Sequence, residues 1–235
     1  MNIFRIFLDS SLAAQIIMSV LAIFSIWSWA IFFKKLFEFS KVKRLSEIFF
    51  SNYYSHQDIQ QLENMGYLLN DSPYGRILES GIEEYKKLKA SKPVHSFEQD
   101  TQKENPNLQE ELSDNIRLAM ERIKITEMSK LETSLPALST FVSVSPFLGL
   151  LGTVWGIMVA FLDIRARGSA HITIVAPGIS DALITTVYGL LVAIPALIFY
   201  NIFQSRINNF NSEFNKFVSE VFSRLRKNLL HRSEH

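Results

Sequence analysis

Three long stretches with almost no charged side chains constrain the fold of this 235-residue chain more than any other feature. They cover residues 10–33, 135–162 and 182–205, and Asp181 directly precedes the last one. Each is longer than the roughly 20 apolar residues that a helix needs to cross about 30 Å of hydrocarbon. The sequence therefore predicts an all-α membrane protein with three transmembrane helices, at residues 10–33, 135–162 and 175–203.

The first stretch is too long for the apolar region of a secretory signal. Lys34 and Lys35 follow it in place of a cleavage site with small residues. We therefore expect this helix to remain in the mature protein.

Basic residues near the ends of the three stretches predict which side of the membrane each segment faces. The segments 1–9 and 163–174 hold only Arg5, Arg165 and Arg167. The flanks within 34–134 and 204–235 hold Lys34, Lys35, Lys41, Lys43, Arg44, Arg122, Lys124, Lys130, Arg206 and Lys216. The positive-inside rule thus predicts that the N-terminus and a 163–174 loop lie outside, and that the C-terminus lies in the cytoplasm.

The expected cytoplasmic region, residues 34–134, carries apolar residues at helical spacing. One helix is predicted to begin at Pro73 after a Ser72 cap, and a second to begin after Pro106. We expect the two to pack as a hairpin around a mobile loop at 91–107, which is too polar to offset its ordering entropy. Beyond the third stretch, a further apolar stripe predicts that the last helix continues through 204–235 and packs on the hairpin or on a neighbouring subunit; its members are Ile207, Phe210, Phe214, Phe217, Val221 and Leu225.

Composition and missing motifs exclude several classes of function. The formal net charge of +1 argues against a nucleic-acid partner, and the absence of cysteine excludes disulfides and thiolate sites. The five histidines are scattered, no glycine-rich nucleotide signature occurs, and no histidine in the spans can activate a serine. We therefore expect no enzyme activity, no cofactor and no metal site.

Small residues recur every four positions in the second and third stretches. In the second they form two adjacent rows, one of Gly152, Gly156 and Ala160 and one of Ser145, Gly149 and Thr153. In the third, Thr185, Gly189 and Ala193 form a row beside Ala182 and Thr186, and Pro195 is expected to loosen the backbone near the inner end. Small residues let helix backbones approach in a membrane, so these rows predict packing faces, within one subunit or between subunits.

Asp181 lies within the third predicted helix, 175–203, and a carboxylate in a span is by default a candidate for function. Two interpretations stay open: it exchanges protons, or it lies at the outer end of the third helix, near a start at Pro177, where the helix dipole favours negative charge. For each span threonine, the alternative to a role in a pore is a hydrogen bond to its own helix, four residues back.

These residues lie in segments that resemble the TolQ/ExbB/MotA family of stator subunits, which drive proton-powered motors in bacterial inner membranes. The resemblance covers all three spans and is strongest over "LETSLPALSTFVSVSPFLGLLGTVWGIMVAF" and "VAPGISDALITTVYGLLVAIPALIFYN". "FSIWSWAIFFKK" in the first span looks more like the TolQ branch than the ExbB branch. The four spans of MotA-type stators are not matched, because this chain has three.

The resemblance implies a ring, a pentamer of this subunit around a dimer of a TolR-like single-span partner whose membrane aspartate carries the proton. Thr153 and Thr186 match the family's pore threonines, while Asp181 stands where the family usually has glutamate and Thr185 where it usually has alanine. We group Thr153, Thr186, Asp181, Thr185 and Ser145 as candidate proton-path or pore-lining residues. Gly149, Gly152, Gly156, Gly189, Ala193 and Pro195 are the candidate packing residues.

The functional prediction that follows is a proton-channel stator of a Tol-Pal-type motor in the bacterial inner membrane, with a periplasmic N-terminus. It would couple the proton motive force, through TolR-like and TolA-like partners, to envelope integrity and cell division. Two alternatives are an ExbB-like subunit that energises TonB-dependent uptake across the outer membrane and a non-conducting membrane scaffold.

Overall fold

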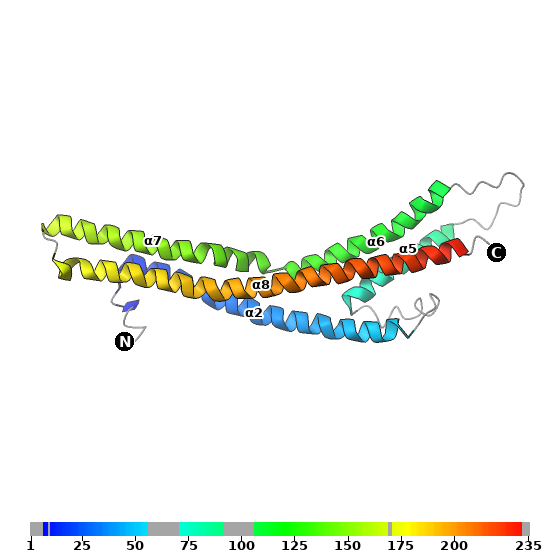
Figure 1. Cartoon of the computed structure of the whole chain (residues 1–235), viewed down its shortest axis with the longest axis horizontal. Helices are drawn as coiled ribbons and strands as arrows, with labels where there is room; N and C mark the ends of the chain where they lie inside the picture. Colours follow the sequence, from blue (N-terminus) through cyan, green and yellow to red (C-terminus); the bar gives the residue numbers. More distant parts are fainter. Residues whose placement is uncertain (1–6, 9, 56–70, 92–105, 169–170, 232–235) are drawn as a thin grey trace, which may run out of the picture. The chain divides into compact units, whose positions relative to one another are not determined.

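The computed structural model describes residues 7–8, 10–55, 71–91, 106–168 and 171–231 (Figure 1). Their main elements are the helices α2 (Leu12–Tyr53), α5 (Pro73–Ser91), α6 (Pro106–Glu132), α7 (Leu135–Arg167) and α8 (Ile172–His231). No strand occurs among these described residues, which confirms the all-α prediction. Three helices, α2, α7 and α8, are long and apolar enough to cross a membrane.

The chain divides into two compact units, each described by itself. Unit 1 comprises residues 1–36 and 133–205, and unit 2 comprises residues 37–132 and 206–235. Helices α2 and α8 contribute a segment to each unit. The apolar stretches predicted to span the membrane fall in unit 1.

In unit 1, α7 packs antiparallel to α8, and the two ribbons run side by side (Figure 1). Helix α2 runs parallel to α8, because Leu21 shares a buried cluster with Val192 and, farther along, Phe32 stacks on Phe199 with ring centroids 4.2 Å apart. Aromatic contacts also join α2 to α7, where the rings of Phe24 and Phe141 stack at 4.7 Å. Large apolar side chains thus hold α2, whereas small residues line the contact between α7 and α8.

The connection between α7 and α8 is shorter than the predicted 163–174 loop. Helix α7 continues through Arg167 and ends at Gly168, whose φ of 62° is a left-handed value that glycine adopts without a steric penalty. Helix α8 begins at Ile172, so only residues 168–171 lie between the two helices. Pro177 therefore lies inside α8 and not at its start. Charged residues such as Arg165 end a hydrophobic stretch but do not end a helix.

In unit 2, the hairpin of α5 and α6 forms as predicted and packs on the second half of α8. Helix α5 begins at Pro73, and the Ser72 hydroxyl accepts a hydrogen bond from Gly75 N–H at 3.4 Å. Of the predicted α8 stripe, Phe210 is half-buried and the other members are buried. Most of the predicted 91–107 loop lies outside the described residues, although Ser91, Pro106 and Asn107 are helical.

Two buried polar side chains of unit 2, Glu127 and Tyr74, form hydrogen bonds with partly or fully exposed partners. The Arg76 guanidinium on α5 donates two hydrogen bonds to the Glu127 carboxylate on α6, at 2.9 and 2.6 Å, and Lys130 donates a third at 2.7 Å. Burial alone would raise the pKa of Glu127, but these donors outweigh it and lower the pKa. The Tyr74 hydroxyl donates to Glu213 on α8 at 2.8 Å. Burial and the neighbouring Glu213 raise the pKa of this phenol.

Candidate functional site

The contact between α7 and α8 is built on glycines that bring the two backbones together. A Cβ atom added at Gly189 would lie 2.6 Å from the carbonyl oxygen of Ser145, and one added at Gly156 would lie 2.7 Å from the carbonyl oxygen of Gly178. A Cβ at Gly149 would meet the Thr185 carbonyl oxygen at 3.0 Å. The small residues therefore pack within one subunit, which answers a question that the sequence left open.

Ser145 and Thr185 lie inside this contact, and both side chains are 0 % exposed. Each hydroxyl donates to its own helix, Ser145 to Phe141 O at 2.6 Å and Thr185 to Ala182 O at 2.8 Å. A side chain enclosed between two packed helices cannot reach a water-filled passage unless the helices separate. Pore lining by these two residues stays a prediction, and their burial in the single chain favours a role in packing.

Thr153 and Thr186 meet across the same contact but remain partly exposed. Their hydroxyl oxygens lie within hydrogen-bonding distance of each other. The Thr186 hydroxyl also reaches Gly149 O on α7 at 3.1 Å, and the Thr153 hydroxyl reaches Ala182 O on α8 at 3.1 Å. Sequence reasoning selected both threonines singly, whereas the structure brings them together as an interhelical hydroxyl pair.

The Thr153 hydroxyl also lies 3.3 Å from Gly149 O of its own helix, four residues back. Because each threonine has one donor and two acceptor lone pairs, the pair can arrange its two protons in more than one way, and two arrangements use a carbonyl of the opposite helix. In one, Thr186 donates to Gly149 O and Thr153 donates to Thr186. In the other, Thr153 donates to Ala182 O and Thr186 donates to Thr153. In each arrangement one hydroxyl oxygen receives no hydrogen bond from the pair and is available to accept one from a third group.

Asp181 does not cap the start of its own helix, which begins nine residues earlier at Ile172. Its Oδ2 accepts a hydrogen bond of 2.6 Å from the backbone N–H of Ser11, directly before α2. No local sequence pattern indicates this contact, because the two residues are 170 positions apart.

The remaining predicted packing residues lie farther along α8. Ala193 is 6 % exposed, in agreement with a packed position, and Pro195 lies within α8. Helix α8 continues without a break past Pro195 to His231.

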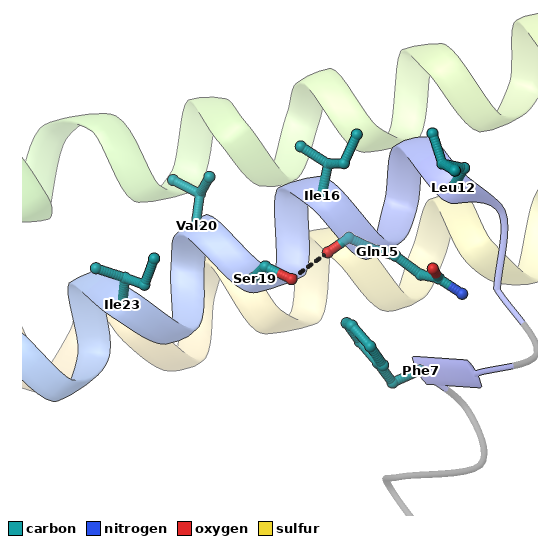
Figure 2. Close-up of a pocket in the computed structure, with 7 residues that line it drawn as sticks. All are labelled: Phe7, Leu12, Gln15, Ile16, Ser19, Val20 and Ile23. Atoms are coloured by element: carbon teal, nitrogen blue, oxygen red, sulfur yellow. Dashed lines mark hydrogen bonds between the residues drawn. The ribbon is translucent and has the colours of Figure 1, made fainter.

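An open groove beside the first turns of α2 is lined by Phe7 and by residues of α2 (Figure 2). Its polar groups bond to the chain itself: the Ser19 hydroxyl donates to Gln15 O at 2.7 Å, and Gln15 Nε2 donates to Ser10 O at 3.0 Å. The other lining side chains are apolar, so the groove adds no group that could carry a proton.

Comparisons with known proteins assign the chain to a family of membrane proteins. A model of the MotA/TolQ/ExbB proton channel family matches residues 70–216, which include α7 and most of α8. The chain is 31 % identical to the Tol-Pal system protein TolQ of Haemophilus influenzae, over 100 % of this chain and 98 % of that protein. It is 32 % identical to TolQ of Pseudomonas aeruginosa, over 97 % of this chain and 91 % of that protein. The biopolymer transport protein ExbB of Pseudomonas putida is 28 % identical over 95 % of this chain and 63 % of that protein.

Proposed function

Because the chain belongs to the MotA/TolQ/ExbB proton channel family, we propose that it is the proton-channel stator subunit of a Tol-Pal-type motor in a bacterial inner membrane. Its three long apolar helices make it a multi-pass membrane protein. The proposed topology follows the distribution of basic residues, with the N-terminus in the periplasm and the C-terminus in the cytoplasm.

The observation that carries the proposal is the pair of hydroxyls contributed by Thr153 and Thr186. They lie within two apolar helices, where a hydroxyl without a hydrogen-bond partner is costly. Unlike Ser145 and Thr185, both are partly exposed, so a group from another chain can reach them. We propose that this pair lines the proton path.

The chemistry of the pair fits a carboxyl group as the proton carrier. A protonated carboxyl can donate to whichever threonine oxygen has no donor from the pair, and both intramolecular hydrogen bonds remain in place. A carboxylate, in contrast, needs a threonine proton and breaks one of these bonds. The pair can therefore hydrogen-bond to either form of a carboxyl group, as acceptor to the neutral acid and as donor to the carboxylate, and we propose that this acid belongs to a TolR-like single-span partner.

The proposed assembly is a pentameric ring of this chain around a partner dimer. In the single chain, the outer faces of α7 and α8 expose large apolar side chains such as Phe147, Val154 and Leu191, which lipid or neighbouring subunits would cover. Each proton that crosses 100 mV contributes about 2.3 kcal/mol. Proton passage through the ring would move the partner and, through a TolA-like protein, transmit force to the cell envelope and the division site.

The proposal is tested by removing each hydroxyl while keeping the side-chain shape. In cells that lack the native protein, Thr153→Val and Thr186→Val are expected to form a partner-bound complex but to lose envelope integrity, measured as survival in detergent. Thr185→Val is the matched control, because it removes a buried hydroxyl from the same contact and leaves Ala182 O with the Thr153 donor. If both Thr153→Val and Thr186→Val support wild-type survival, a non-conducting scaffold explains the protein better.

A second candidate function is that of an ExbB-like subunit that energises TonB-dependent uptake across the outer membrane. The similarity to Pseudomonas putida ExbB over 95 % of this chain favours it. Expression in strains that lack either TolQ or ExbB separates the two functions. We expect the chain to restore detergent resistance in the first strain, and restored uptake of iron chelates in the second alone would favour ExbB.

A further inference from the structure

The carboxylate of Asp181 is already engaged within the chain. Its Oδ2 accepts a hydrogen bond from the Ser11 N–H at 2.6 Å. Ser11 directly precedes helix α2, and its carbonyl oxygen accepts from Gln15 N–H at 2.9 Å while its Oγ accepts from Ala14 N–H at 3.4 Å. Ser11 is thus the N-cap residue of α2, and the Asp181 side chain on α8 accepts a hydrogen bond from its backbone N–H. The backbone N–H groups before and within a first helical turn have no partner inside the helix, so an acceptor from another helix fixes the helix end.

This hydrogen bond lies at one end of a parallel register between α2 and α8. Farther along, Leu21 lies in the cluster of Val192, and the rings of Phe32 and Phe203 approach to 5.8 Å. Phe32 lies 21 residues after Ser11, and the two α8 rings that it contacts, Phe199 and Phe203, lie 18 and 22 residues after Asp181, so the two helices keep a similar register. These apolar contacts are less directional than a hydrogen bond to a carboxylate, which specifies where α2 begins relative to α8.

Asp181 directly precedes the residue whose carbonyl oxygen can accept a hydrogen bond from the hydroxyl pair. The next residue, Ala182, is 1 % exposed, and its carbonyl oxygen accepts from Thr153 in one of the two proton arrangements. A Cβ added at Gly156 would lie 2.9 Å from Ala182 Cβ, so this turn of α8 sits directly against α7. A displacement of α8 at Asp181 therefore moves the acceptor of the Thr153 hydroxyl.

We propose that Asp181 is a positioning residue, which ties the start of α2 to the turn of α8 that carries Ala182 O and so keeps the hydroxyl pair of Thr153 and Thr186 in register. It accepts a hydrogen bond and does not exchange the transported proton. This role rests on the proposed function only for its effect on transport, because the contact with Ser11 can be measured separately.

Substitutions at Asp181 distinguish a residue that positions α2 through a hydrogen bond from a residue that exchanges the transported proton. Asp181→Asn keeps an oxygen that accepts the Ser11 N–H but cannot release a proton at physiological pH, whereas Asp181→Ala removes the acceptor. Asp163→Asn is the matched control, because it removes the same charge from the last turns of α7, whereas Asp181 lies on α8. Two quantities are measured on the complex: hydrogen–deuterium exchange of the amides at residues 10–15, and proton-dependent envelope integrity in cells.

The expected result is that Asp181→Asn retains most of the activity and the amide protection of the wild type. Asp181→Ala is expected to lose activity and to exchange these amides faster by about tenfold, as loss of a hydrogen bond to a charged acceptor implies. Unchanged amide exchange in Asp181→Ala would refute the contact. Normal protection with abolished activity in Asp181→Asn would show that Asp181 exchanges protons. The exchange rates of the amides at residues 10–15 do not depend on proton transport, so they test the contact between Asp181 and Ser11 even if the stator proposal fails.

Discussion

A methyl group added at Gly189 should force α7 and α8 apart. The new Cβ would lie 2.6 Å from Ser145 O and 3.1 Å from Gly149 Cα, both of them backbone atoms that cannot rotate away. An ordinary contact between carbon and a carbonyl oxygen is about 3.3 Å, so the two backbones must separate by roughly 0.7 Å. A gap of that size loses about a quarter to a half of each dispersion contact across it.

Two opposing terms set the size of the effect of Gly189→Ala. Overpacking of a tight contact costs about 1–3 kcal/mol, and the rigid obstacle places this site near the upper end. Alanine recovers up to about 1 kcal/mol through its higher helix propensity, which leaves a net loss of about 2 kcal/mol. For a chain of this length the melting temperature should fall by about 4–8 °C. Thermal melting of the purified complex in detergent measures this loss.

Val187→Ile provides the matched control, because it adds one carbon to α8 at a side chain that is 55 % exposed. Its melting temperature should equal that of the wild type. A Gly189→Ala variant that melts with the control would refute the close approach of α7 and α8.

The obstacle at Gly152 differs in kind, which provides an internal comparison. A Cβ there would lie 2.6 Å from Thr185 Cβ and 3.0 Å from its Cγ2, both side-chain atoms. Thr185→Gly removes them, so Gly152→Ala combined with Thr185→Gly should be more stable than the two single losses predict, by about 0.5–3 kcal/mol. Strict additivity would show that the two residues do not touch.

Three further predictions concern unit 2 and the topology. Glu127→Gln should destabilise the complex by about 1–2 kcal/mol at pH 7, since it removes the charged acceptor of Arg76. The folded-state pKa of Glu127 is lowered, so the extra stability of the wild type over Glu127→Gln should be fully present above the unfolded-state pKa of 4.5 and should disappear as the pH falls through the lower folded-state pKa. Melting temperatures of both proteins from pH 7 to pH 3 measure this, and a difference that stays constant would contradict it. Tyr74→Phe should lower the free energy of unfolding by about 1–2 kcal/mol through loss of the hydrogen bond to Glu213, and an unchanged melting temperature would show that this bond does not stabilise the fold. In the cysteine-free chain, His171→Cys should react with an impermeant maleimide in intact cells and Lys87→Cys only after permeabilisation, whereas the reverse pattern would invert the topology.

Features that depend on local pattern could be predicted from the sequence. The uncharged stretches indicated α2, α7 and α8, and the spacing from Ile207 to Leu225 indicated that α8 continues beyond the apolar segment. Ser72 and Pro73 marked the start of α5, because capping is a property of a few adjacent residues. The predicted 163–174 loop was too long, because hydropathy detects the end of an apolar segment and not the end of a helix.

Features that depend on two distant segments could not be predicted. The rows of small residues indicated packing faces, but only the structure pairs Gly149 with Thr185 and Thr186 of the same subunit. All four candidate residues in the contact between α7 and α8 have a hydroxyl group, and only the structure shows that Ser145 and Thr185 are buried whereas Thr153 and Thr186 are partly exposed. The contact of Asp181 with Ser11 follows from the register of α2 on α8, which no spacing along the chain encodes.

We propose above that the hydroxyl pair of Thr153 and Thr186 lines the proton path. The most direct measurement is proton flux into liposomes that hold the complex with its single-span partner, driven by an imposed membrane potential and followed by a pH-sensitive dye. We expect Thr153→Val and Thr186→Val each to reduce the flux to that of empty liposomes, while Thr185→Val conducts as the wild type does. Wild-type flux through both Thr153→Val and Thr186→Val would contradict it.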